Sequence, residues 1–267
     1  MSHALLSLAC HAYGLAAVFY LVYLVRQWRL LTVAARALVA SGLVLHGVAL
    51  GMDLTQQGGV PQGLGQGLSA VALLLLAIFV GLDLRYRTPV LGAFLTPLAL
   101  TVLVPGVLIS GGASPLSAAV LRPLLPVHIT IALLGIAAFA VASGIAVMYL
   151  LMERQMKGKK FGLLFARLPS LDFMDDLNRR LVVAGFILLS ITLVTGSFLS
   201  NHADGVFWQW RPTEVATLIA WLVFGAVLGA RMLSGWQGRR VAWVTMAGFG
   251  LLLVSLVTSY PQMRMVP

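Results

Sequence analysis

Charged and catalytic side chains are scarce in this sequence. Charged residues make up 10% of its 267 residues, and Asp and Glu together number only 8, whereas a soluble globular domain is about 25% charged. General acid–base catalysis therefore has few candidate residues. The sequence also has no P-loop, no zinc-protease motif and no serine-hydrolase pattern, so it gives no support to nucleotide hydrolysis or to these protease and hydrolase classes.

Cys10 is the only cysteine, which excludes an internal disulfide and a dithiol relay. His11 follows it directly, as the histidine follows the second cysteine in the C-x-x-C-H haem-attachment pattern. A thioether between Cys10 and a haem held by His11 is therefore one interpretation. However, neighbouring side chains on a regular helix point about 100° apart, and a buried cysteine commonly acts as a small apolar residue. Both interpretations stay open at this point.

Long apolar segments dominate the composition. Hydrophobic residues make up 60% of the chain, the mean hydropathy is +0.97, and an uncharged apolar run of about 18 residues can span a bilayer as a helix. These runs predict an all-α polytopic membrane protein, a bundle of eight transmembrane helices forming a single domain over residues 1–267. The expected spans are 4–25, 33–52, 66–82, 90–108, 125–152, 181–200, 213–233 and 240–260.

The formal net charge of +10 is distributed unevenly over the expected loops. Of 18 Lys and Arg residues, 15 fall near the odd-numbered connections, and the other side has only Arg122, Arg211 and Arg264. Cytoplasmic loops of membrane proteins are enriched in Lys and Arg, so we expect the odd-numbered loops in the cytoplasm and both chain termini outside. The positive charge thus indicates membrane topology and does not indicate nucleic-acid binding.

All five histidines fall toward the expected outer side of the membrane. The helical rise places His11 about 10 Å, His46 about 9 Å and His128 about 5 Å below the outer boundary. His202 is expected just beyond the outer end of the span 181–200, and His3 is a terminal residue. This distribution predicts a deep pair, His11 with His46, and a shallow pair, His128 with His202.

Paired histidines in an apolar environment are suited to haem. Ionisable residues within the bilayer are costly and usually functional, and two neutral imidazoles on opposite sides of a porphyrin can both ligate its iron. Histidines that only pack or form hydrogen bonds are the main alternative. A proton path would normally include acidic partners, and a zinc site would need three or four ligands at one depth. We therefore expect bis-histidine haem sites near the outer face.

An aromatic loop is expected above the shallow pair. The segment SNHADGVFWQWRPTE places Trp208 and Trp210 at the membrane surface, where tryptophan is common in interfacial belts. A belt alone does not account for the order in which this tryptophan pair is followed by Pro212 and Glu214 at the head of the next span. Trp208, Trp210 and Glu214 are therefore candidates for cofactor binding.

The second half of the chain, roughly residues 120–260, resembles the CcsA/CcmC/HemX-type cytochrome c assembly proteins. The similarity rests on LLPVHITIALLGIAAFAVASGIAVMYLLMER, in which His128 opens a helix on the outer side, and on FWQWRPTEVATLIAW with the GWQGRR turn that follows. Members dedicated to cytochrome c maturation have an aspartate where this chain has Arg211, and a histidine near the last helix that this chain lacks. These departures favour the HemX-like branch, with His202 as a substitute partner of His128.

The resemblance implies a protein of the bacterial cytoplasmic (inner) membrane that binds b-type haem and handles it for cytochrome c assembly. Two alternative functions stay open. A haem fixed covalently by Cys10 would suit a membrane redox protein that exchanges electrons with quinone. A membrane regulator of haem biosynthesis would instead use the basic cytoplasmic connection 153–180 to recruit other cytochrome c biogenesis or haem-biosynthesis proteins. Apolar residues recur there at the spacing of an interfacial amphipathic helix, although a solvated loop is the alternative: Phe161, Leu164, Phe165 and Leu168.

Overall fold

A computed structural model describes the chain except for residues 57–58, 62, 110–123, 160–161, 163–164 and 264–267. In the described part the structure is helical, without strands, and eight helices are long and apolar enough to cross a membrane. The expected number of spans is thereby confirmed. The helices are α1 (Ser2–Arg26), α2 (Arg29–Gln56), α3 (Leu64–Tyr86), η1 (Pro89–Leu91), α4 (Gly92–Leu108), α5 (Leu124–Lys157), α6 (Leu171–Asp204), α7 (Pro212–Ser234) and α8 (Arg239–Met263).

Helix α6 begins well before the apolar run that predicted it from residue 181. Ser170 caps its start, because the Ser170 hydroxyl oxygen accepts a hydrogen bond from the Phe173 N–H at 3.3 Å. Asp172 in the first turn is further favoured by the positive end of the helix dipole. These polar residues stabilise the helix start, which an apolar run cannot detect.

The connection between α5 and α6 differs from the expected amphipathic helix. Its described residues 165–168 form turns and a bend, while Phe161 and Leu164 lie outside the described residues. Leu168 is buried against the core of the bundle. In this part of the chain the apolar residues therefore do not form one continuous helical face.

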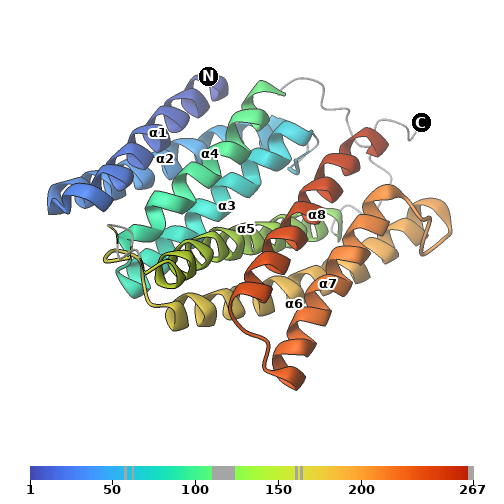
Figure 1. The fold of residues 1–267 in the computed structure, drawn as a ribbon. Coiled ribbons are helices and arrows are strands. Elements are labelled where there is room, and N and C mark those ends of the chain that lie inside the picture. The colour runs from blue at the N-terminus through green and yellow to red at the C-terminus, as the bar shows by residue number, and fades with distance from the viewer. Residues whose placement is uncertain (57–58, 62, 110–123, 160–161, 163–164, 264–267) are drawn as a thin grey trace.

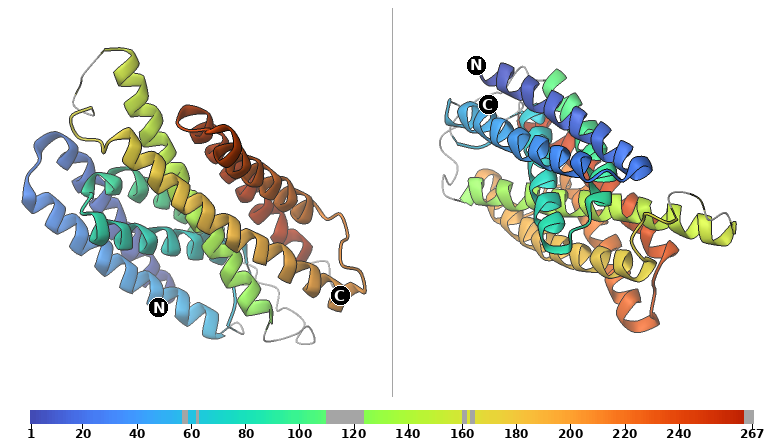
Figure 2. Two further views of the ribbon diagram at one scale, coloured as in Figure 1. Left: turned by 90° about the horizontal axis from the view of Figure 1, so that it is seen from below. Right: turned by 90° about the vertical axis from the view of Figure 1, so that its left-hand side faces the viewer.

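Helix α5 is the centre of the bundle. Of its most apolar stretch, 78% is buried inside the protein, against 17% for α7. It contacts α3 and α4 on one side and α6 and α8 on the other. Figure 1 shows α1–α4 and α6–α8 as two groups that flank it, and the views in Figure 2 show the same two groups from other directions.

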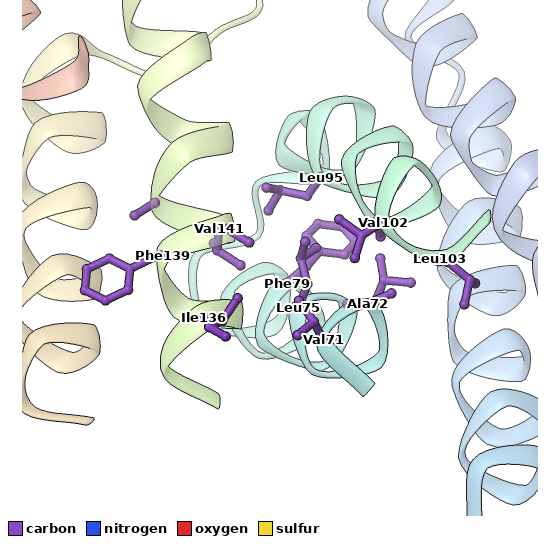
Figure 3. Packing of buried hydrophobic residues seen from close by; sticks show 14 of the residues in the cluster. Val71, Ala72, Leu75, Phe79, Leu95, Val102, Leu103, Ile136, Phe139 and Val141 are labelled. Carbon is purple, nitrogen blue, oxygen red and sulfur yellow. The ribbon is translucent and has the colours of Figure 1, made fainter. Parts of the chain in front are cut away.

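Small residues on α5 allow this close packing. Helices in a bilayer associate through van der Waals contact and hydrogen bonds, because lipid tails are as apolar as the side chains that they replace. Gly135 of α5 lies against Leu188 of α6, and Gly144 lies against Leu95 of α4. Figure 3 shows Phe139 of α5 pointing away from α3, toward the other half of the bundle.

Gly248 of α8 leaves no room for a side chain. A Cβ atom at this position would lie 2.5 Å from Cζ of Phe224. Phe224 cannot easily move, because it is fully buried and stacks on Phe139 with ring centroids 3.8 Å apart. We therefore expect Gly248→Ala to lower the free energy of unfolding by about 1–3 kcal/mol through overpacking, measured by thermal unfolding of the detergent-purified protein.

Gly250→Ala is the matched control in the same helix. Apart from the helix's own backbone and its chain neighbours, no described residue lies within 4 Å of a Cβ atom at Gly250. Alanine is a better helix former than glycine by about 1 kcal/mol, so this variant should be as stable as the wild type or more stable. Equal destabilisation by both variants would contradict the packing argument.

The two ends of the bundle carry different side chains. The α1–α2, α3–α4, α5–α6 and α7–α8 connections lie at one end, called the basic end here (Figure 1). The α6–α7 loop, the start of α1 and the end of α8 lie at the other, called the tryptophan-loop end. Two interhelical ion pairs join helices at the basic end: Arg36 with Asp83, 2.6 Å apart, and Arg231 with Asp175, 3.0 Å apart.

Candidate functional site

His128 lies in the second turn of α5, at the tryptophan-loop end, and its ring packs against α6. Its Nδ1 atom is 2.7 Å from Oγ1 of Thr195. Gly196 provides the space for the ring, since a Cβ atom there would lie 3.1 Å from Cε1 of His128. The imidazole is thus held by one polar and one steric contact from the same neighbouring helix.

The hydrogen bonds of Thr195 determine which nitrogen of His128 carries the proton. The Thr195 hydroxyl has two backbone carbonyl acceptors in reach, Ile191 at 2.8 Å and Thr192 at 3.2 Å. When it donates to one of them, its oxygen accepts from His128, so we assign the proton of that bond to the ring. Nδ1 of His128 is therefore the donor, and Nε2 of the neutral ring keeps its lone pair. Nε2 has no hydrogen-bond partner among the described residues. Metal-binding histidines are commonly oriented in this way, with the second nitrogen held by a neighbouring group.

The loop 205–211 between α6 and α7 is held in place by polar contacts to its backbone. The Ser200 hydroxyl donates to the carbonyl of Val206 at 2.9 Å, and the Glu214 carboxylate accepts from the Gln209 N–H at 2.8 Å. Glu214 lies in the first turn of α7, where the helix dipole also favours a carboxylate. In this structure Glu214 holds the loop through its hydrogen bond with the Gln209 N–H. Cofactor binding by Glu214, which the sequence suggested, stays a prediction.

The two tryptophans of this loop form an edge-to-face pair with ring centroids 6.0 Å apart. Trp210 is 73% exposed and has φ 60°, an uncommon backbone conformation for a residue other than glycine. Trp208 is half-buried, and its buried Nε1 lacks a hydrogen-bond partner in the described part of the chain. A buried indole N–H normally has a partner, so this donor is available to an acceptor on a ligand.

His202 lies in the last turn of α6, because this helix continues to Asp204 instead of ending at residue 200 as expected. Its Nδ1 donates to the Phe198 carbonyl at 3.1 Å, and the side chain is exposed. His202 follows Thr195 by two helical turns and therefore lies on the same face of α6, about 10 Å closer to the loop. The His128 ring and the His202 side chain thus both belong to one face of α6. Arg211 forms an ion pair with Asp204, near the end of the same helix, at 2.9 Å.

His46 has a different environment. It is completely buried, its Nε2 is 2.7 Å from Oγ of Ser69, and its Nδ1 is 3.4 Å from the hydroxyl of Tyr13. Both ring nitrogens thus have partners, and the side chain connects α1, α2 and α3. Iron ligation by His46 stays a prediction, and it would require one of these two hydrogen bonds to break.

The structure does not bring His11 and His46 together as the expected deep pair. His11 is exposed, and its Nδ1 donates to the Ser7 carbonyl at 2.7 Å. Tyr13, which contacts His46, lies two residues further along α1, so it points about 160° away from His11. The prediction relied on depth, which fixes a position along the helix axis but not the direction of a side chain around it.

Cys10 also points away from His11. It is half-buried and packs against the core, whereas His11 lies on the exposed surface of α1. A haem bound to the exposed His11 ring would therefore not lie over the Cys10 sulfur without a change in the helix. Covalent attachment through Cys10 stays a prediction.

Thr195 and Gly196 position His128, but the sequence alone does not identify them as its partners. The available signal was a polar stripe in an otherwise apolar span, with hydroxyl residues three to five residues apart on α6: Thr192, Thr195 and Ser200. Their relation to His128 depends on the packing of α5 against α6. A single span therefore indicates that its polar face has a partner, but it does not identify that partner.

Comparisons with known proteins agree on one family. The model of the cytochrome c assembly protein family matches residues 15–261. The cytochrome c biogenesis protein CcsA of Synechococcus sp. (strain JA-3-3Ab) is 32% identical over 193 residues, covering 53% of this chain and 56% of that protein. CcsA of Synechococcus sp. (strain CC9902) is 30% identical over 199 residues, covering 64% of this chain and 65% of that protein. The chain therefore spans between about half and two thirds of the length of these relatives.

A similar fold occurs in a solved structure, that of the cytochrome c heme lyase CcmF. The TM-score is 0.63, and the alignment covers 100% of this chain and 46% of CcmF. The sequence identity of 16% limits this likeness to the fold. The arrangement of the eight helices is thus one that a larger protein also contains.

Proposed function

Because the chain belongs to the cytochrome c assembly protein family, we propose that it binds haem at the tryptophan-loop end and presents it for cytochrome c assembly. The chain is a multi-pass membrane protein whose described residues include eight apolar helices, and we place it in the bacterial inner membrane. The concentration of Lys and Arg at the basic end supports an orientation with that end in the cytoplasm and both termini outside. Arg211, in place of an aspartate, supports the HemX-like branch.

The orientation of His128 is the observation that carries this proposal. Its Nδ1–H is held by Thr195 at 2.7 Å, and Nε2 is the nitrogen that remains for haem iron. A neutral imidazole is a common axial ligand of haem. His202, which lies on the same face of α6 as Thr195, is the proposed second ligand.

The tryptophan loop supplies groups that fit the remainder of a haem molecule. The exposed ring of Trp210 suits the flat apolar macrocycle, and the Nε1–H of Trp208, which has no partner among the described residues, suits an anionic propionate. Arg211 adds a cation that can form charge-assisted hydrogen bonds to the same kind of group. We propose that these three side chains hold haem as cargo at the membrane surface, because b-type haem without a covalent bond can be released to an acceptor.

The test is the haem content of the full chain purified in detergent. We expect a pyridine haemochrome spectrum of b-type haem, removed completely by acid–acetone extraction, in the wild type and equally in Cys10→Ala. His202→Ala should lower the haem content per chain. His3→Ala removes a histidine from the same end of the bundle and should leave the haem content unchanged.

Three results would contradict this proposal, each in a different way. Absence of haem above background would remove the haem-binding function. Haem that resists extraction in the wild type and becomes extractable in Cys10→Ala would indicate a fixed redox cofactor, because a covalently attached haem cannot be handed over. Loss of haem in His46→Ala, with unchanged thermal stability, would indicate that haem is bound at His46 and not at the tryptophan-loop end.

A further inference from the structure

An open cavity of about 600 Å³ lies at the basic end, between the end of α5 and the connection from α7 to α8. Its volume is in the range of small-molecule sites, and it is at the opposite end of the bundle from His128. The side chains that characterise its lining are Glu153, Lys157, Trp236, Gln237, Arg239 and Arg240. The proposed haem function makes no use of this cavity.

The cavity has an excess of positive charge. Among the described residues of its lining, Glu153 is the only one with a carboxylate, and it pairs with Lys157 at 2.6 Å. Arg239 and Arg240 form no ion pair in the described part of the chain. Arg240 is held at the wall by the Trp236 ring, whose centroid lies 5.7 Å from the guanidinium carbon. Two guanidinium groups are therefore available to an anion.

The start of α8 adds backbone donors to the same wall. Gly238 precedes this helix without a side chain that could cap it, and its own N–H donates to Asp175 at 3.1 Å. The Ala242 N–H bonds to the Gly238 carbonyl at 3.0 Å, so the N–H groups of residues 239–241 have no acceptor within the helix. Free N–H groups and the dipole at a helix start both favour a phosphate.

The wall of the cavity is rigid before any ligand binds. Asp175 accepts from both terminal nitrogens of Arg231, at 3.0 and 3.1 Å, in addition to the Gly238 N–H. Gly238 has φ 72° and lies against the Tyr149 hydroxyl, which a Cβ atom would approach to 2.5 Å. These contacts fix the α7–α8 connection to α5 and α6, so binding would cost little ordering of the protein.

We propose that this cavity is a phosphate-binding site at the membrane surface. Its surroundings favour the head group of an anionic phospholipid, because the last turn of α7 presents apolar side chains for the acyl chains: Met232 is 86% and Leu233 is 90% exposed. Basic pockets between transmembrane helices commonly bind anionic lipid head groups. A soluble phosphate compound has the same recognition chemistry and is the second source.

The experiment measures thermal unfolding of the full chain in detergent against increasing phosphatidylglycerol, phosphatidylcholine or inorganic phosphate. Phosphatidylglycerol should raise the unfolding temperature of the wild type, and phosphatidylcholine should not. The double variant Arg239→Gln/Arg240→Gln should need at least about tenfold more phosphatidylglycerol, because each Lys or Arg near an anionic lipid contributes roughly a fivefold gain in affinity.

The matched control is Arg179→Gln/Arg180→Gln, which removes two cations from the same end of the bundle. These arginines pair with the exposed Asp176, and neither lines the cavity, so this control should respond like the wild type. Inorganic phosphate that stabilises the wild type against thermal unfolding, but not the cavity variant Arg239→Gln/Arg240→Gln, would support the site and assign it to a soluble phosphate compound.

If both double variants lose the stabilisation by phosphatidylglycerol to the same extent, the proposal is overturned, because such a result would show a general effect of surface charge. Failure of all three probes to protect the wild type would overturn it as well. If the cavity variant does not fold, Lys157→Gln is tested in the same way, with a smaller expected loss. None of these results depends on haem, so the outcome is separate from that of the proposed function.

Discussion

Substitution of His128 by alanine is expected to lower the haem content of the purified protein at least about tenfold. The variant removes the only imidazole whose Nδ1 is held by α6 at Thr195 and whose Nε2 lacks a partner among the described residues. Loss of a group that merely orients a metal ligand costs 10–100-fold in affinity, and loss of the ligand itself should cost at least as much. Haem per chain from the pyridine haemochrome spectrum is the measurement.

Thr195→Val tests the orientation of His128 separately from its presence. Valine keeps the shape of threonine but removes the acceptor for Nδ1–H, so haem affinity should fall by about 10–100-fold while the iron ligand is retained. Thr192→Val is the matched control, because the Thr192 hydroxyl donates to the Leu188 carbonyl at 2.8 Å, whereas the hydrogen bond of His128 is formed with Thr195. Haem titration of the apoprotein, followed by absorbance, measures both variants.

If His128→Ala keeps the haem content of the wild type, the assignment of His128 as a haem ligand is contradicted. Equal losses in the valine variants at Thr195 and Thr192 would contradict the orientation argument alone. Thermal unfolding of each variant accompanies the titration, because a general loss of folding would lower the haem content of all of them.

The number and order of the spans were predictable because each depends on a local property. An apolar run long enough to cross the bilayer forms a helix wherever it occurs, since the backbone must satisfy its hydrogen bonds internally. Helix ends were less predictable: α6 begins at its cap Ser170, in a segment with several aspartates. Polar capping and ion pairs, rather than apolarity, stabilise that first part of the helix.

The candidate site was predictable only in part, because the side-chain direction depends on the neighbouring helix. His128 and His202 both lie at the tryptophan-loop end, because the distance of a residue from a span end follows from the helical rise; their role as a ligand pair stays a prediction. His11 and His46 have similar depths, but His11 is exposed and His46 is completely buried. Their different environments arise from the packing of α1 on α2, which no single span encodes.

The role of a charged residue likewise depends on the neighbouring helix and not on its own span alone. The uneven distribution of Lys and Arg suggested one role for all of them, membrane orientation. The side chain of Arg231 is instead 6% exposed and binds Asp175 of α6 through two nitrogens. A basic residue at the end of a span can therefore also be part of the packed interior, and its partner then becomes essential for stability.

Asp175→Ala is expected to lower the free energy of unfolding by about 3–5 kcal/mol, since it leaves the buried guanidinium of Arg231 without a counter-charge. The Gly238 N–H loses its acceptor in the same variant, so the α7–α8 connection should loosen as well. Thermal unfolding of the detergent-purified protein measures the effect. Asp176→Ala is the matched control at the next residue: the Asp176 side chain is exposed, and its partners among the described residues are Arg179 and Arg180, so little change is expected.

A double variant separates the buried charge from lost packing. Arg231→Met in the background of Asp175→Ala removes the unpaired cation and keeps a long apolar side chain, and removal of both charges of a buried pair is often close to neutral. We therefore expect this double variant to be more stable than Asp175→Ala alone. If the double variant is less stable instead, the guanidinium of Arg231 stabilises the protein through contacts other than the ion pair, such as its hydrogen bond to Asn178 at 3.3 Å. That result would contradict the ion pair as the main stabilising interaction between α6 and α7.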